Sequence, residues 1–517
     1  MALQMFHFAA LAAATLPSLV SATPRISLRQ VNSTTGRGCD ALARAGLSDQ
    51  LYFQNDTEYQ GTLNTYYDGS IQALNPRCVL KPESTQHVSD ALKALSEEGG
   101  NCWTVGIRSG GHSVAPNNNA QNGVTIDLER LNSVKYTEDA SSGKGQGIAS
   151  IGSGARWGDV YTELEKDGVM VTGAREGHVG VGGFLLGGGF SWQSGRYGMA
   201  CDNVVGYEVV LANGTVVTAT STSHPDLWQS LKGGLNNIGL VTRFDMQTFP
   251  SQDAYGGIVA FPYTSAEGLL ETFTSMVKRK GEHPEENGFV SLTYSPATGP
   301  SAAFVLANVD GAENSTSFTG LGELTPIIDM RSRTPISGLV KQLEGALGLY
   351  NVWFTITFQA NMVIGRKILE VFDSLVADVK DVLGASDQII FVLTPLPRNY
   401  ANYGPNVLGL NNSLDEDCMV LQAEALLSTP EHKVLLTEKL QEAVEQTLNS
   451  YATETHSLMN WKYLNYANTL QDVWWTIGDS LDLLKRTARA YDPAGFFQTR
   501  VKGGFKLSDI DELVKFF

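Results

Sequence analysis

The spacing of apolar residues early in the chain predicts alternating strands and helices. After Ser84, a residue of a type that commonly caps helices, apolar residues recur at the spacing of a helix. Short apolar runs at 78–80 and 103–107 flank this helix, so the three elements form a β-α-β unit. A further run at 124–128 predicts the next strand. The second strand of the unit therefore leads directly into Arg108.

The same pattern continues to about residue 250. An apolar run at 148–152 predicts a strand, and the segment before Gly168 has the spacing of an amphipathic helix. Two further strand-like runs flank Asn213-Gly214, the strongest two-residue signal for a hairpin turn. We therefore predict one α+β domain of short strands over residues 35–250.

Later residues carry longer strand-like runs and a helical stripe. The predicted strands are 257–261, 289–294, 353–358 and 388–393, and the helix covers 364–376.

The N-terminus has the pattern of a secretory signal peptide. Residues 5–19 form an apolar run that is too short to span a bilayer, and Val20-Ser21-Ala22 provides small residues for cleavage. We predict a signal peptide over residues 1–22 and a mature protein that is secreted or lumenal in the secretory pathway. No later stretch is long and apolar enough for a membrane span.

Charge and cysteine content narrow the classes of partner. The 37 basic and 54 acidic residues give a net charge of −17, which argues against nucleic acid or an anionic membrane as a partner. The five cysteines are too scattered for a disulfide scaffold or a zinc site, and one disulfide is expected among Cys39, Cys78 and Cys102. Five sequons predict N-glycosylation at Asn32, Asn55, Asn213, Asn314 and Asn411.

The segment Arg108-Ser109-Gly110-Gly111-His112 follows the second strand of the β-α-β unit. Paired glycines let main-chain N–H groups approach a ligand closely, and the histidine is then aimed at that ligand. Gly-Gly turns are common, however, and a single histidine is more often structural. The segment alone does not decide between these interpretations.

A second glycine-rich segment covers residues 173–189. It is not a dinucleotide-binding fingerprint, because Leu185 stands at the third glycine position and no clean buried strand precedes it. The apolar residues between the glycines argue against a flexible loop. We therefore expect these glycines to bring main chain close to a large, flat or polyanionic ligand.

These motifs, in this order, resemble the FAD domain of vanillyl-alcohol-oxidase-type flavoproteins, in particular the berberine-bridge-enzyme-like branch. The similarity includes Lys232-Gly233-Gly234 with the residues after it, Tyr463-Leu464-Asn465-Tyr466 and the segment 491–498, and it extends over about residues 37–510. The resemblance implies a two-part FAD domain, 35–250 plus 455–517. A substrate domain, 251–450, would be inserted as an antiparallel sheet backed by helices that roofs the flavin ring.

The resemblance also implies a covalent cofactor. His112 would bond to the 8α-methyl carbon of the flavin, and relatives with two links add a cysteine where residues 175–178 here are Arg-Glu-Gly-His, so we expect a single 8α-histidyl link. By the same resemblance, the residues expected to bind FAD are Arg108, Ser109, Gly110, Gly111, His112, Ser113, Gly173, Gly177, Val179, Gly180, Val181, Gly182, Gly183, Gly187, Gly189, Gly239, Val241, Tyr463 and Asn465.

Four residues are candidates for the proton transfer that accompanies hydride transfer. Tyr463 and Tyr466 belong to the family's Tyr-x-Asn-Tyr motif, although a tyrosine pair can also simply pack a domain boundary. Gln422 and Glu424 fall where relatives carry a catalytic carboxylate or glutamine. Val181 lies where a small valine tends to admit dioxygen, although it can equally be a packing residue.

The predicted function is an FAD-dependent oxidase of a small organic molecule in fungal secondary metabolism, with dioxygen as acceptor and hydrogen peroxide as product. Two alternatives remain: a carbohydrate oxidase that converts a lactol to a lactone, and a flavin-bearing binding protein without turnover. The missing cysteine argues against the carbohydrate site.

Overall fold

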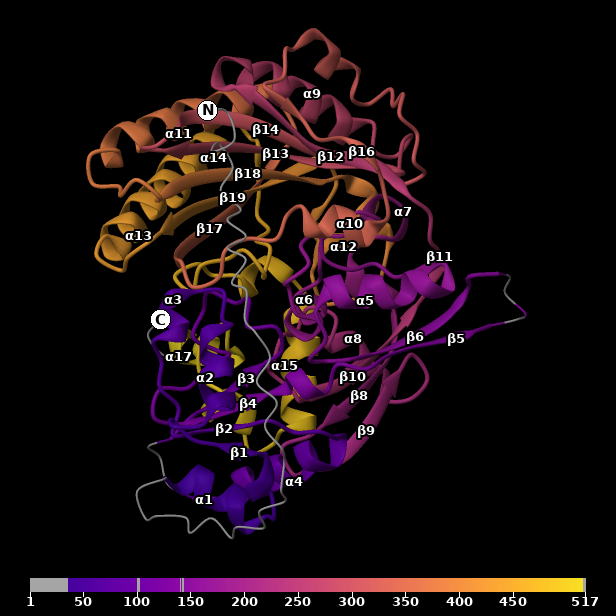
Figure 1. Ribbon diagram of the computed structural model, residues 1–517, viewed down its shortest axis with the longest axis vertical. Helices are drawn as coiled ribbons and strands as arrows, with labels where there is room; N and C mark the ends of the chain where they lie inside the picture. The colour runs from indigo at the N-terminus through magenta and orange to yellow at the C-terminus, as the bar shows by residue number, and fades with distance from the viewer. Residues whose placement is uncertain (1–35, 100–102, 140, 142–143, 515–517) are drawn as a thin grey trace, which may run out of the picture.

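The computed structural model describes residues 36–99, 103–139, 141 and 144–514, and they form two lobes (Figure 1). The predicted signal peptide and the Asn32 sequon lie outside these described residues. The lower lobe combines the described residues between 36 and 250 with the C-terminal segment, and the upper lobe is one large sheet with helices on its outer side. The mixed helix and sheet fold that we expected is confirmed.

A four-stranded sheet at the bottom contains the predicted β-α-β unit. Its order is β1-β2-β4-β3, in which β4 pairs in parallel with both β2 and β3. Helix α4 begins at the expected cap, because the Ser84 side chain accepts a hydrogen bond from the His87 N–H. The bounds are β1 (Leu51–Tyr52), β2 (Cys78–Leu80), α4 (Thr85–Glu97), β3 (Val105–Arg108) and β4 (Val124–Asp127).

A disulfide joins this sheet to the first helix. Cys39 of α1 (Arg37–Arg44) is bonded to Cys78 of β2. The third cysteine of the expected group, Cys102, lies outside the described residues. Cys201 and Cys418 are buried free thiols.

A five-stranded antiparallel sheet completes the core of the lower lobe. Its order is β5-β6-β10-β8-β9, and β8 and β9 form the predicted hairpin around Asn213-Gly214. The glycine-rich segment and α5 pack against this sheet. The bounds are β5 (Val134–Glu138), β6 (Gly147–Gly152), α5 (Trp157–Leu164), α6 (Val181–Leu186), β8 (Val204–Val210), β9 (Val216–Thr220) and β10 (Leu240–Gln247), with β7 (Val169–Met170) and β11 (Phe249–Pro250) as a separate pair.

The upper lobe is a nine-stranded antiparallel sheet whose outer face is covered by helices α9, α11, α13 and α14 (Figure 1). The other face of the sheet looks toward the lower lobe. The four strands predicted here are confirmed, and the structure adds five. The strands are β12 (Ala254–Pro262), β13 (Glu286–Ser295), β14 (Gly299–Asn308), β15 (Ile328–Asp329), β16 (Ser332–Thr334), β17 (Tyr350–Gln359), β18 (Gln388–Leu396), β19 (Cys418–Leu427) and β20 (Leu458–Met459).

Helix α11 is the predicted apolar stripe at 364–376. The described helices that complete both lobes are α2 (Thr57–Asn64), α3 (Gly69–Gln72), α7 (Ser194–Tyr197), α8 (Pro225–Ser230), α9 (Ala266–Lys278), α10 (Ile336–Lys341), α11 (Met362–Val379), α12 (Leu410–Ser413), α13 (Lys433–Gln441), α14 (Asn449–Glu454), α15 (Ser480–Tyr491), α16 (Phe496–Thr499) and α17 (Leu507–Val514). None of the helices among these described residues is both long and apolar enough to cross a bilayer.

The C-terminal segment returns to the lower lobe after one last strand in the upper one. Strand β20 pairs with β17, and α15 then packs against α8. The Asn237 amide donates to the carbonyl of Phe505 at 3.0 Å, and Gln498 donates to the Asn237 carbonyl at 2.8 Å. These bonds tie the segment to the loop before β10.

Candidate functional site

Two glycine loops of the lower lobe touch through their main chains. A Cβ atom on Gly110 would lie only 2.5 Å from Gly180 Cα, and a Cβ atom on Gly180 would collide with the Gly110 nitrogen. Ser109 fixes the contact from the side, because its hydroxyl accepts from the Gly182 N–H at 3.1 Å and donates to the Ser153 carbonyl at 2.6 Å. The two segments that the sequence singled out therefore form one surface.

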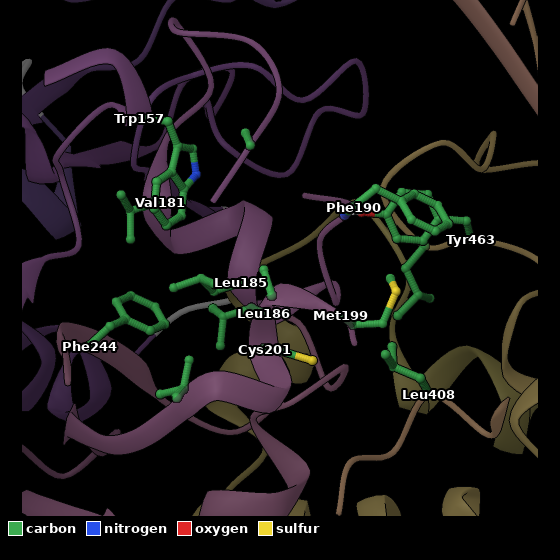
Figure 2. Packing of buried hydrophobic residues seen from close by; sticks show 14 of the residues in the cluster. Trp157, Val181, Leu185, Leu186, Phe190, Met199, Cys201, Phe244, Leu408 and Tyr463 are labelled. Carbon is green, nitrogen blue, oxygen red and sulfur yellow. Dashed lines mark hydrogen bonds between the residues drawn. The ribbon is translucent and has the colours of Figure 1, made fainter. Parts of the chain in front are cut away.

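Main-chain hydrogen bonds join the second glycine loop, around residues 179–181, to the start of α5. The Trp157 N–H donates to the Val179 carbonyl, and the Val181 N–H donates to the Ala155 carbonyl, both at 3.0 Å. Val181 then begins α6, where its side chain is fully buried in the lower-lobe core (Figure 2). Gly183 in the first turn of α6 is exposed, and its Cβ position meets no atom within 4 Å.

His112 lies at the end of the first loop, after Gly111, whose φ of +74° favours glycine. Its imidazole stacks on Tyr67 with ring centroids 4.0 Å apart. The Nε2 atom is buried and has no hydrogen-bond partner among the described residues, and Glu176 Oε2 lies 3.7 Å from it. Burial, with the nearby Arg156 charge, lowers the pKa of His112 to about 3. The imidazole is therefore neutral, with its lone pair available for bonding.

The Arg108 side chain points away from this surface. Its guanidinium forms a fully buried ion pair with Asp127 at 2.8 and 2.9 Å and also donates to the Thr65 hydroxyl at 2.7 Å. The Ser113 hydroxyl bonds locally with the main chain of Ala115. Only the main chain of Arg108 is available to the expected ligand, and its side chain shapes the loop.

The other glycines of the expected site fit closely against neighbouring side chains. A Cβ atom on Gly173 would collide with Trp157, one on Gly177 with Glu344, and one on Gly187 with Asn465. Gly189, at φ +96°, has Phe184 beside it. Gly239 and Val241 lie at the start of β10, where they pack against β8.

Tyr463 binds the end of the glycine-rich run. Its hydroxyl oxygen accepts hydrogen bonds from the N–H groups of Gly189 and Phe190 at 3.1 and 3.3 Å, and from the Asn465 amide at 3.0 Å. The ring lies beside Phe190 (Figure 2). Burial raises the pKa of Tyr463 above its ordinary value. These contacts give Tyr463 a positioning role rather than the role of a base.

Tyr466 is placed differently, beside a cation at the boundary between the lobes. Arg175 donates to the Tyr466 hydroxyl at 2.9 Å and to the Thr394 hydroxyl at 3.2 Å. The Arg175 guanidinium lies over the ring of Phe289, 4.6 Å from its centroid. Tyr466 and Arg175 from below thus meet Thr394 and Phe289 of the upper sheet.

Gln422 and Glu424 alternate with the β19 residues that pack under the outer helices, so both lie on the sheet face toward the lower lobe. Burial alone raises the pKa of Glu424 to about 8. Glu424 is paired in register with Trp353 of β17, whose ring lies 5.8 Å from that of Tyr67.

Tyr67 connects this sheet face to His112. Burial raises its pKa well above the ordinary value, and the negative charges of Glu424 and Glu176 add to the effect. Tyr67 therefore lies near both carboxyl groups. Sequence reasoning missed Tyr67, Trp353 and Thr394, because only their partners across the domain boundary distinguish them from ordinary core residues.

The site has two sides of different character. The lower side offers main chain from two glycine loops and an unpartnered neutral histidine, which fits the phosphates and ring of a large flat cofactor. The upper side offers two polar side chains among aromatic rings. This fold and site define a flavin-dependent oxidoreductase.

Comparisons with known proteins agree. Residues 76–220 match the FAD binding domain family. The FAD-dependent monooxygenase drtC of Aspergillus calidoustus is 32% identical over 91% of this chain and 90% of its own length, and sdcF of Emericella nidulans, also called an FAD-dependent monooxygenase, is 31% identical over 92% and 99%. The chain belongs to the berberine-bridge-enzyme-like family of FAD-linked oxidoreductases, as the sequence motifs indicated.

Solved structures share the fold. A variant of berberine bridge enzyme in complex with (S)-reticuline has a TM-score of 0.70 at 16% identity, over 89% of this chain and 97% of the other. Chitooligosaccharide oxidase has a TM-score of 0.69 at 20% identity, over 89% and 98%.

Proposed function

We propose that this enzyme holds FAD through a single covalent bond to His112 and oxidises a small organic substrate, with dioxygen as the final electron acceptor. The observation that carries the proposal is the buried, neutral imidazole of His112, whose Nε2 has no hydrogen-bond partner among the described residues, beside two touching glycine loops. A nitrogen lone pair at this place can bond to the 8α carbon of a flavin that lies on the loops.

FAD supplies the site with an acceptor for two electrons. Glu424 takes the proton of the substrate, because a buried carboxyl group with a pKa near 8 is a stronger base than an ordinary glutamate. Arg175, with Tyr466 and Thr394, orients a polar group of the substrate. Tyr67 and Trp353 bury a flat or apolar part of it.

Hydrogen peroxide is the expected product of reoxidation, because position 181 carries the small valine that tends to admit dioxygen in the family that the chain resembles. The relatives named FAD-dependent monooxygenases suggest a second outcome, in which an oxygen atom enters the product. Turnover in ¹⁸O-labelled dioxygen separates the two: an oxidase gives labelled peroxide and an unlabelled product.

The similarity of the fold to chitooligosaccharide oxidase leaves a sugar substrate as the alternative, and activity assays with a panel of oligosaccharides test it. Absence of turnover with every donor would favour a binding role.

Replacing His112 with alanine tests the covalent bond. We expect wild-type protein to keep its flavin absorbance after acid denaturation and to yield a flavin-bearing peptide that contains residue 112. His112→Ala should bind FAD only reversibly. His432→Ala, at the start of α13, is the control and should keep the covalent flavin. A flavin that leaves the wild-type protein in acid would contradict the proposal.

We also propose that the protein passes through the secretory pathway and carries N-linked sugars. Asn55, Asn213, Asn314 and Asn411 are exposed, so each of these described sequons is accessible to modification. The Cys39–Cys78 disulfide suits an oxidising compartment.

A further inference from the structure

A row of titratable side chains leads from His112 toward solvent. Glu176 Oε2 lies 3.7 Å from His112 Nε2, and Glu176 Oε1 lies 3.5 Å from His178 Nδ1. The other nitrogen of His178, Nε2, lies 3.5 Å from Glu344 Oε2. The His178 and Glu344 side chains are 35% and 27% exposed, so the row ends in contact with water.

Glu176 is held at this place by the main chain. Its carboxylate accepts hydrogen bonds from the N–H of Val179 at 2.9 Å and from the N–H of Gly345 at 3.3 Å. Burial raises the pKa of Glu176 to about 7, with a smaller contribution from Glu344 and partial compensation by the main-chain bonds. The charged and titratable groups around it are His112, His178, Glu344, Tyr67 and Arg156.

Two buried nitrogens in this row have no hydrogen-bond partner among the described residues. They are Nε2 of His112 and Nδ1 of His178, and each lies next to one oxygen of Glu176. A carboxylate between two such nitrogens can take a proton from the first and give it to the second. The imidazolium so formed then releases a proton from its other nitrogen, which for His178 faces Glu344.

We propose that Glu176 is the proton acceptor for the attachment of FAD to His112, and that His178 and Glu344 pass this proton to solvent. The inference rests on the proposed covalent bond at His112. It assigns a role to the segment that replaces the second-link cysteine of relatives, since residues 175–178 bring Glu176 and His178 to the tether.

The attachment step balances as follows. The 8α-methyl group loses one C–H bond, and its proton goes to solvent. His112 Nδ1 forms a bond to that carbon, while the proton on Nε2 goes to Glu176. The electron pair of the broken C–H bond remains on the flavin ring, which is thereby reduced by two electrons. Dioxygen then takes the two electrons and, with two protons from solvent, becomes hydrogen peroxide, and the flavin returns to its oxidised form.

The test measures attachment rather than turnover. The full chain is produced in a riboflavin-limited host, FAD is added, and covalent flavin is followed by the mass of the intact protein. Glu176→Gln keeps an oxygen for one of the two main-chain bonds, from Val179 or from Gly345, and removes the base. We expect attachment to slow roughly 100-fold at pH 7, while reversible FAD binding persists. Glu163→Gln, on the exposed side of α5, should attach at the wild-type rate.

The pH dependence distinguishes a proton acceptor from a structural residue. In the wild type, the rate should rise with pH through about 7 and then level off, because the carboxylate form of Glu176 accumulates above its pKa. In Glu176→Gln, hydroxide replaces the missing base, so the rate should continue to rise to pH 9.5. A variant that stays slow at every pH would overturn the proposal.

His178→Phe provides a second variant that leaves Glu176 in place. It should slow attachment less than Glu176→Gln does, since only the exit of the proton is blocked. Wild-type attachment rates in both variants would overturn the inference while leaving the bond to His112 intact. Wild-type protein that never forms a covalent adduct would instead contradict the proposed function.

Discussion

At the scale of single residues, the site separates two carboxyl groups by their surroundings. Glu176 receives two main-chain hydrogen bonds, and burial raises its pKa to about 7. Glu424 has no such compensation, and burial raises its pKa to about 8. Glu176 lies 3.7 Å from His112, whereas Glu424 lies on the face of the upper sheet that looks toward the lower lobe, and both carboxyl groups act on the pKa of Tyr67.

Glu424→Gln should remove the base and keep the shape of the side chain. We expect kcat to fall roughly 10²- to 10⁴-fold, with covalent FAD retained. In the wild type, kcat/KM should rise with pH through about 8, because only the ionised carboxyl group accepts a proton. Steady-state kinetics between pH 6 and 10 checks both points, and Glu163→Gln, on the exposed side of α5, is the matched control. A variant with the wild-type rate and pH profile would move the base elsewhere.

Stability gives a second measurement on the same residue. The pKa of Glu424 is higher in the folded state than in the unfolded chain, so ionisation costs the folded state stability as pH rises from about 4.5 to about 8. Glu424→Gln should therefore raise Tm relative to wild type at pH 8 and leave it unchanged near pH 4.5. Thermal unfolding at the two pH values measures the difference, and equal shifts at both would contradict this account.

At the scale of elements, the glycine-rich run depends on a residue that is almost 300 positions away. Tyr463 accepts hydrogen bonds from two N–H groups at the end of this run, and Asn465 fills the space that a side chain at position 187 would need. The tyrosine motif of the C-terminal segment therefore positions α6 and the loop after it. The two tyrosines of the motif make different contacts, since the Tyr466 hydroxyl accepts a hydrogen bond from Arg175.

Tyr463→Phe leaves the buried N–H groups of Gly189 and Phe190 without their acceptor, while the Asn465 amide keeps its bond to the Phe184 carbonyl. Each unsatisfied buried group costs about 1–3 kcal/mol, so we expect a loss of at least 2 kcal/mol of unfolding free energy and weaker FAD retention. Tyr136→Phe on β5 is the control, because the Tyr136 hydroxyl donates to the Gln146 carbonyl at 3.4 Å near the surface and not in the core. Urea unfolding compares the two variants. Equal unfolding free energies for the two variants would show that the Tyr463 hydroxyl does not stabilise the end of the glycine-rich run.

At the scale of the whole molecule, a fully buried aspartate joins the two lobes. Asp68 caps α3 in the lower lobe, accepts from the Asn351 N–H of β17 at 2.8 Å, and lies 3.3 Å from Lys433 of α13. The adjacent Tyr67 accepts from the Gly348 N–H with its carbonyl. The contact that holds the lobes together therefore also sets the position of the ring that stacks on His112.

Asp68→Ala should disturb this boundary rather than either lobe. Removing the Asp68 carboxylate leaves the N–H groups of Ser70, Ile71 and Asn351 without their acceptor, at a cost of about 1–3 kcal/mol for each group that stays buried. KM should rise because Trp353 and Glu424 shift relative to His112. Asp329→Ala, which breaks a partly exposed pair with Arg331, should cost no more than about 1 kcal/mol. Urea unfolding and steady-state kinetics measure both effects. An unchanged KM would mean that the Asp68 contact between the lobes does not determine how the site residues of the two lobes lie relative to one another.

Local sequence determined much of the fold and one side of the site. The helix behind Ser84, the hairpin at Asn213-Gly214, the glycine loops and His112 were predicted because their signals lie within a few neighbouring residues. Strand β19 was not predicted as a strand, since almost every residue in it is buried and apolar and polar residues do not alternate regularly. Only the tertiary structure shows that Tyr67 stacks on His112, that Arg108 pairs with Asp127, and that the Tyr463 hydroxyl accepts a hydrogen bond from the glycine-rich run. Those roles depend on contacts between segments far apart in sequence, which no local pattern encodes.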